Sequence, residues 1–240
     1  MNKSAVSILL AFVCAVYTAS AQVRVTKGAG HKTTIDWSGF GGSQTEAGSA
    51  FKKTLQDDLV RSGWFTPAAR GQGILVLQGL YEDTGSDLKV KCYVFEMQTK
   101  QSYLSKSYRA GTAEARRLAH KVADEIIEAV TGKKGLCSGR LVVVGNRTKN
   151  KEIYLCDFDG QNVVQLTRDG KISLAPKWSP DGNTIVYTAY LKGYPDVYSI
   201  DLATGNRQRL AGYPGLNTGA DISPNGREVA LILSKDGNPE

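Results

Sequence analysis

Two stretches of the chain carry apolar residues at helical spacing. In residues 46–62 they recur every four positions, with Lys and Asp side chains on the opposite face: Ala47, Phe51, Leu55 and Leu59. Gly63 comes directly after them and suits the C-terminal end of a helix. The second stretch begins at Thr112, a residue suited to an N-cap, and places its apolar residues on one stripe that stops at Gly132. The pattern predicts two amphipathic helices.

Alternating apolar and polar positions predict strands around these helices. The expected strands are residues 33–37, 74–80, 88–97 and 102–109, and we expect a Gly-rich turn at Gly41 and Gly42 before the first helix. This order predicts a small α+β domain at residues 32–132, with both helices on one face of a short mixed sheet. Residues 133–139, rich in Gly and Lys, are the expected linker to the C-terminal part of the chain.

The rest of the chain contains a repeat. The stretch 178–182, Trp-Ser-Pro-Asp-Gly, returns 44 residues later as Ile-Ser-Pro-Asn-Gly at 222–226, with its surroundings in register. Ser-Pro-Asp-Gly suits a tight turn, because Pro sets φ, Asp bonds its own backbone and Gly tolerates positive φ. Asn225 stands where the first copy has Asp181, which favours a turn residue over a calcium ligand. Four short strands in each unit of roughly 40 to 45 residues predict the blades of an all-β propeller.

Residues 140–240 supply about two blades. Three strands at 141–144, 153–158 and 163–166 form an incomplete blade, residues 174–210 form a complete one, and a third starts at Ala220. Propellers close with about four to eight blades. We therefore expect a truncated propeller, with open strand edges that favour aggregation.

The N-terminal 21 residues have the features of a secretory signal peptide. A basic start at Lys3 precedes an apolar run at 5–17, and small residues before Gln22 predict cleavage after Ala21. The run is shorter than the roughly 20 residues that a membrane-spanning helix needs. The exported chain then begins with a short alternating arm at 22–31, hinged by glycines, which can add a strand to the edge of a sheet.

Composition and cysteine use exclude several classes of protein. The formal net charge of +7 is spread along the chain without a basic run, as on a solvated surface, and does not indicate a nucleic-acid groove. The exported chain keeps Cys92, Cys137 and Cys156, an odd number at spacings that predict neither a disulfide framework nor a metal site. We expect Cys92 and Cys156 to be buried in strands and Cys137 to be exposed in the Gly-rich connection.

No catalytic residue emerges from the motifs. The chain has no Gly-x-Ser-x-Gly nucleophile elbow, and its two histidines, His31 and His120, have no Cys, Asp or Glu at metal-ligand or triad spacing. Each histidine is therefore interpreted as structural or solvent-exposed. The sequence predicts a protein that is not an enzyme and that needs no metal or cofactor.

Three motifs carry a family resemblance. Residues 58–65 read Asp-Leu-Val-Arg-Ser-Gly-Trp-Phe, the second predicted helix contains Ala123-Asp124-Glu125 and ends in Thr131-Gly132, and residues 175–182 read Ala-Pro-Lys-Trp-Ser-Pro-Asp-Gly. With the signal peptide and the arm, this order resembles the TolB family of periplasmic proteins. Many secreted propellers share the Ser-Pro-Asp-Gly turn, so the N-terminal motifs make the resemblance specific.

The resemblance implies a six-bladed propeller without catalysis. It implies a periplasmic scaffold of the Tol-Pal system, which links the inner membrane to the outer membrane and peptidoglycan during cell constriction. The arm would add a strand to TolA, an inner-membrane protein, through Gln22, Val23, Arg24, Val25 and Thr26. The propeller mouth would bind the peptidoglycan-associated lipoprotein, Pal, and the protein itself is expected to be a monomer.

By the same resemblance, two blade-entry loops are the candidates that line this mouth. They contain Ser173, Leu174, Ala175 and Pro176, and Leu216, Asn217, Thr218 and Gly219. Asn217 matches the Asn usual in the family, whereas Leu216 stands where a His is common.

A different class of function is the alternative: an exported propeller that accompanies a prolyl-oligopeptidase-type hydrolase or binds oligosaccharide. A nucleophile elbow downstream of residue 240 would favour the hydrolase, and three to four further blades would favour TolB. A propeller scaffold with other protein partners is the third reading.

Overall fold

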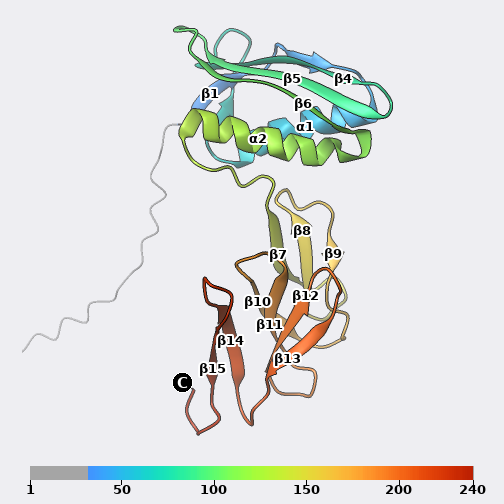
Figure 1. The fold of residues 1–240 in the computed structure, drawn as a ribbon, viewed down its shortest axis with the longest axis vertical. Helices are drawn as coiled ribbons and strands as arrows, with labels where there is room; N and C mark the ends of the chain where they lie inside the picture. The colour runs from blue at the N-terminus through green and yellow to red at the C-terminus, as the bar shows by residue number, and fades with distance from the viewer. Residues whose placement is uncertain (1–31, 240) are drawn as a thin grey trace, which may run out of the picture. The chain divides into compact units, whose positions relative to one another are not determined.

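The structure is a computed structural model that describes residues 32–239, so the expected signal peptide and arm lie outside the described residues. Its first part is one mixed six-stranded sheet with two helices (Figure 1). The strands are β1 (Thr33–Asp36), β2 (Phe40–Gly42), β3 (Phe65–Pro67), β4 (Leu75–Asp83), β5 (Asp87–Glu96) and β6 (Ser102–Gly111). The sheet order is β3-β1-β4-β5-β6, and β2 pairs with β4.

Helix α1 (Glu46–Arg61) confirms the first predicted helix. The Thr45 side chain accepts a hydrogen bond from the Gly48 backbone N–H at 3.2 Å, which caps its N-terminus. Phe51, Leu55 and Leu59 of its apolar stripe are fully buried, and Ala47 is partly buried. The chain leaves the helix through Gly63, whose φ of 79° suits glycine.

Helix α2 (Ala115–Thr131) begins later than predicted. Thr112 lies in a 3-10 turn, η1 (Thr112–Glu114), and its hydroxyl donates to the Gly85 carbonyl at 3.3 Å, so its expected role as N-cap was wrong. The predicted end is confirmed, because Gly132 adopts a left-handed φ of 67° and its N–H bonds to the Glu128 carbonyl. Both helices lie on one face of the sheet (Figure 1).

The Gly-rich turn expected at Gly41 and Gly42 is instead strand β2. Its residues pair in parallel with β4, with Gly42 opposite Tyr81. Phe40 is buried at the start of this strand, and a Cβ on Gly42 would lie 1.9 Å from the Tyr81 carbonyl oxygen. The glycine is therefore required by close approach of two backbones, which local turn signals do not distinguish from a turn.

The second part consists of three sheets that match the predicted blades. The first is β7 (Arg140–Gly145), β8 (Glu152–Asp157) and β9 (Val164–Gln165). The second has four strands, β10 (Ser173–Trp178), β11 (Thr184–Ala189), β12 (Asp196–Asp201) and β13 (Arg207–Ala211). The third has two, β14 (Asn217–Ile222) and β15 (Val229–Leu233), so the predicted strand count of each blade is confirmed.

The repeated turns use the same hydrogen bonds. In the first copy the Ser179 hydroxyl donates to Asp181 at 2.5 Å, and Asp181 accepts the backbone N–H of Asn183. In the second copy the Ser223 hydroxyl donates to Asn225 at 2.7 Å, and Asn225 accepts the N–H of Arg227. One side-chain oxygen accepts both bonds in each copy, which confirms that Asp181 is a turn residue.

The cysteines follow the sequence prediction with one exception. Cys92, Cys137 and Cys156 are all buried and free, so the expected exposure of Cys137 was wrong. The Asp124 carboxylate accepts hydrogen bonds from the backbone N–H groups of Cys137 and Ser138 at 2.6 and 2.8 Å, which holds the chain after α2 against that helix.

Neither helix in residues 32–239 is both long and apolar enough to cross a membrane.

We expect Phe51→Ala to destabilise the N-terminal sheet and helices strongly. Phe51 is fully buried, and its ring centroid lies 6.2 Å from that of Phe40 and 5.9 Å from that of Tyr81. Loss of a buried aromatic ring costs about 3 to 5 kcal/mol of unfolding free energy. Urea unfolding of the variant measures this loss.

Val60→Ala on the same helix is the matched control. Val60 is 39% exposed, so its truncation should change the unfolding free energy by no more than about 0.5 kcal/mol. Equal urea midpoints for the two variants would contradict the assignment of this aromatic cluster to the core.

Candidate functional site

The segments expected to line the propeller mouth belong to strands. Residues 173–176 lie within β10 and residues 217–219 within β14, so only Leu216 precedes a strand, and their description as loops was wrong. Ser173 pairs with Ala189 of β11, and Asn217 pairs with Leu233 of β15. We call β10 and β14, the first strand of each of these blades, the inner strands. The pairings show that the residues expected in loops already belong to the inner strands.

The structure brings the two segments to the same end of neighbouring blades. The Lys177 ammonium lies 3.3 Å from the Asp221 carboxylate, and these residues are 44 positions apart, one repeat length. The Thr188 and Thr218 hydroxyls also lie 3.1 Å apart. Equivalent positions of successive repeats therefore lie side by side along β10 and β14.

A β-bulge occurs at the same repeat position in both strands. The register of β10 with β11 shifts between Leu174 and Lys177, and that of β14 with β15 shifts between Thr218 and Asp221. Ala175 has a φ of 50° and Gly219 a φ of 66°, both in the left-handed region. Bulges redirect side chains at sheet ends, and these two residues are exposed there.

Asn217 is engaged inside the protein. It is fully buried, its side-chain oxygen accepts the Tyr213 N–H at 2.9 Å, and its amide donates to the Tyr213 carbonyl at 2.8 Å and the Pro195 carbonyl at 3.2 Å. Ser173, one repeat earlier, is also fully buried. The surface available to a partner is therefore formed by Ala175 and Gly219, with partly exposed Leu174, Pro176, Leu216 and Thr218.

A second cluster of polar side chains lies where α1 and α2 meet the turn after β8. The His120 Nδ1 lies 2.5 Å from the Asp58 carboxylate, and its Nε2 lies 4.0 Å from the Asp159 carboxylate. Arg116 pairs with Asp159 and donates to the Thr54 hydroxyl at 3.0 Å. The side chains of Asp58, His120 and Asp159 are each at most 6% exposed.

This environment shifts two pKa values. Burial opposes a charge on His120, but the hydrogen bond that Asp58 accepts and the charges of Asp58 and Asp159 outweigh it, so the pKa of His120 is raised. Burial likewise opposes a charge on Asp159, but the Gln161 backbone N–H and Arg116 outweigh it, so the pKa of Asp159 is lowered. Both shifts favour the charged forms.

Among the described residues, His120, Asp157 and Asp159 bring possible metal-ligand atoms within 4.8 Å of one another. The Arg116 guanidinium already pairs with Asp159, and it would repel a cation placed there. We therefore assign the cluster as a network of ion pairs and not as a metal centre.

Sequence reasoning missed this network. His120 was expected to be structural or exposed, and it is buried, but its partners could not be read from spacing because Asp58 lies 62 residues away. Asp159 lies 43 residues from Arg116.

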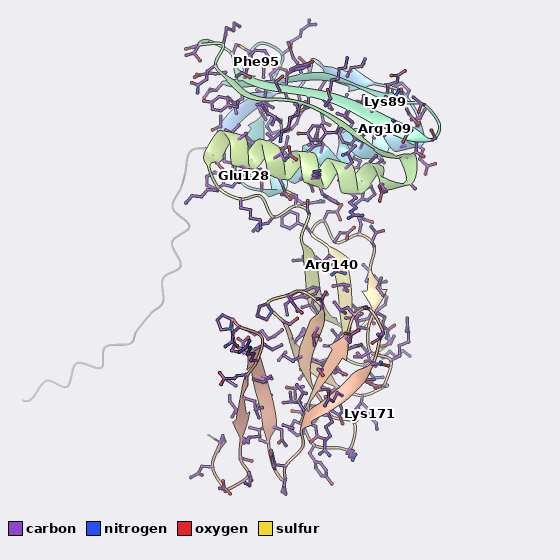
Figure 2. All side chains as sticks on the ribbon, in the orientation of Figure 1. Lys89, Phe95, Arg109, Glu128, Arg140 and Lys171 are labelled. Carbon is purple, nitrogen blue, oxygen red and sulfur yellow. The ribbon has the colours of Figure 1, made fainter. Side chains whose placement is uncertain are left out.

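A cavity of about 970 Å³ lies beside this network. Arg109, near the end of β6, and Arg140, at the start of β7, line it together with His120 and Asp157, and Figure 2 labels both arginines.

Comparisons with known proteins agree on one family. The family described as the TolB beta propeller domain matches residues 127–240. The "Tol-Pal system protein TolB" of Alcanivorax borkumensis is 30% identical over 265 residues, an alignment that covers 98% of this chain and 61% of the relative. The chain belongs to the TolB family. The "Protein TolB homolog" of Chlorobaculum tepidum is 37% identical over 161 residues, which covers 63% of this chain and 37% of that TolB homologue.

A solved structure supports the TolB fold. The chain superposes on the crystal structure of TolB from Acinetobacter baumannii with a TM-score of 0.77 and 24% identity, covering 88% of this chain and 57% of that one. The fold is thus an α+β domain followed by part of a β-propeller. The chain spans less than two thirds of the length of each of these TolB relatives.

We expect Ala175→Gly to stabilise the second blade. Ala175 holds a φ of 50°, where a Cβ costs roughly 1 kcal/mol relative to glycine. The variant should raise the unfolding free energy by up to about 1 kcal/mol, measured by thermal or urea unfolding.

Gly219→Ala at the equivalent bulge is the reciprocal change. Its φ is 66°, and the added Cβ would lie 3.0 Å from the Ile232 side chain, so this variant should lower stability. If both variants shifted the midpoint in the same direction, the equivalence of the two bulges would be wrong.

Proposed function

We propose that this TolB protein is a non-catalytic periplasmic scaffold of the Tol-Pal system. It links inner-membrane Tol proteins to Pal and so supports outer-membrane integrity and constriction during cell division. The observation that carries this proposal is the alignment with the "Tol-Pal system protein TolB" of Alcanivorax borkumensis, which spans both the α+β domain and the blades and covers 98% of the chain. In this proposal residues 1–21 are the cleaved signal, 32–132 the α+β domain, 133–139 the linker and 140–240 the propeller segment.

In this proposal the arm binds TolA by strand addition. Val23 and Val25 alternate with Arg24 and Thr26, a pattern that places apolar side chains on one face of an added strand. Backbone hydrogen bonds supply affinity in this mode, and the alternate side chains supply specificity.

Pal binds at the ends of the inner strands. Support comes from the placement of Ala175 and Gly219, which are exposed at matching bulges of adjacent strands, while Asn217 beneath them fixes the backbone through buried hydrogen bonds. Such a rigid and partly apolar rim suits a protein partner better than a flexible loop does, because less conformational entropy is lost on binding.

Deletion of residues 22–26 from the full-length mature protein should abolish binding to the purified periplasmic part of TolA. We expect at least a hundredfold loss of affinity, about 2.7 kcal/mol, by isothermal titration calorimetry. Replacing Val23 and Val25 by Ser keeps the length of the arm and tests its apolar face. Unchanged affinity in the deletion variant would refute the role of the arm.

Ala175→Asn should weaken Pal binding at least about tenfold in the same assay. Asn tolerates a left-handed φ, so the change adds a polar side chain to the rim while the bulges remain. Gly182→Asn is the control, since Gly182 has a φ of 71°, open space for a Cβ, and a place at the opposite end of β10. Equal losses in the two variants would argue against a Pal site at the rim.

A further inference from the structure

We propose that Asp58, Arg116, His120 and Asp159 form a latch that fastens the first blade to the helices and that weakens when His120 loses its proton. The proposal does not rest on the partners proposed above, because it concerns how two parts of this chain are joined. It is testable on the protein alone.

The helix side of the latch is a buried ion pair. The Asp58 side chain has no exposed surface, and its carboxylate lies 2.5 Å from His120 Nδ1. A carboxylate withdrawn from water needs a positively charged partner, and no other basic group lies within salt-bridge distance of Asp58 in residues 32–239. The burial of Asp58 thus favours the protonated imidazole.

On the blade side, the latch contains a second carboxylate, Asp159, which is bound by Arg116 of α2. Asp159 lies in the turn after β8, where its side chain accepts the Gln161 N–H at 3.0 Å. It pairs with Arg116 and lies 4.0 Å from His120 Nε2. The ion pairs of this network join two carboxylates to one guanidinium, and a protonated His120 supplies a second positive charge between them.

When His120 loses its proton, its contact with Asp159 changes from attractive to repulsive. While Nδ1–H donates to Asp58, a neutral imidazole presents the Nε2 lone pair to the Asp159 carboxylate. Two acceptors then face each other in a buried site, which weakens the attachment of the turn. Within residues 32–239, Nε2 has no hydrogen-bond partner in the protein.

Each element around His120 contributes identified groups. Helix α1 provides Asp58 and the Thr54 hydroxyl, the end of β8 and the turn after it provide Asp157 and Asp159, and α2 itself provides Arg116 and Asp124. The segment before β7 provides Cys137, whose pKa is raised by burial and by the nearby Asp58 and Asp124, so its thiol is neutral at physiological pH.

The direction of the pH effect follows from the raised pKa of His120. Its contribution to the latch is fully present below the ordinary value of 6.5 and is lost as pH rises through the raised value in the latched state. Asp159, whose pKa is lowered, contributes above its ordinary 3.8 and weakens only as pH falls through its lowered value. The cavity of about 970 Å³ beside His120 and Asp157 gives protons a route to the site.

The first test is an NMR titration of the histidines in the full-length protein. His120→Gln removes one histidine signal and so assigns that of His120. We expect His120 to titrate above 6.5 and Asp159→Asn to move that titration downward. Asp57→Asn, which removes the exposed carboxylate beside Asp58 on α1, should leave it unchanged. Titration of His120 at or below 6.5 would overturn the proposal.

The second test measures opening through Cys137, which is 1% exposed and lines the same cavity as His120. N-ethylmaleimide modification is followed for each cysteine by mass spectrometry, and each rate is divided by that of the unfolded chain at the same pH. Protection of Cys137 should fall at least about tenfold, or about 1.4 kcal/mol, between pH 6 and the pH at which His120 has lost its proton. Protection of Cys92 in the core of the α+β domain should not change, which shows that this domain stays folded.

Asp159→Asn should show the lower Cys137 protection at both pH values, and Asp57→Asn should follow the unaltered protein. Protection that is independent of pH in the unaltered protein, or an Asp159→Asn profile identical to it, would show that the network is a static structural feature and not a latch.

Discussion

Burial of β11 on both of its faces is the constraint on which the propeller segment depends. Ile185, Tyr187 and Ala189 point into a cluster shared with Ile153 of the first blade. Val186 points the other way, into a cluster shared with Ala220 of the third sheet. A strand with two apolar faces excludes water only if a blade covers each side, so successive repeats must stack sheet on sheet.

Stacking also determines which residues become neighbours. Because each blade is one repeat, adjacent inner strands align equivalent positions, as Lys177 and Asp221 show. A bidentate salt bridge also joins the first two blades. Arg207 of β13 donates two hydrogen bonds, of 2.7 and 2.8 Å, to the carboxylate of Asp169, which precedes β10. The rim at Ala175 and Gly219 is a consequence of the same alignment.

The α+β domain buries its apolar side chains in a different way. Its helices cover one face of the sheet and form the core with it, so the domain needs no second sheet to close its core. Where it meets the first blade, Phe158 packs against its core, and the ion pair of Arg116 with Asp159 and the hydrogen bonds that the Asp124 carboxylate accepts add polar contacts. Buried charges contribute less to stability than apolar packing does, but they demand specific partners and respond to pH. Such a contact can fix the position of the first blade on the helices and still be reversible.

Short-range physics made much of this fold readable from the sequence. Helical spacing located α1, Gly132 marked the end of α2, and the Ser-Pro-Asp-Gly turns with their repeat gave the number of strands in each blade, because these signals act within a few residues. Tertiary structure alone decided that Gly42 pairs with β4, that residues 173–176 are strand, that Cys137 is buried and that Asn217 bonds inward. It also placed Asp58 against His120 across 62 residues of chain. Such contacts form between side chains that are distant in sequence, and a single sequence carries no periodic signal for them.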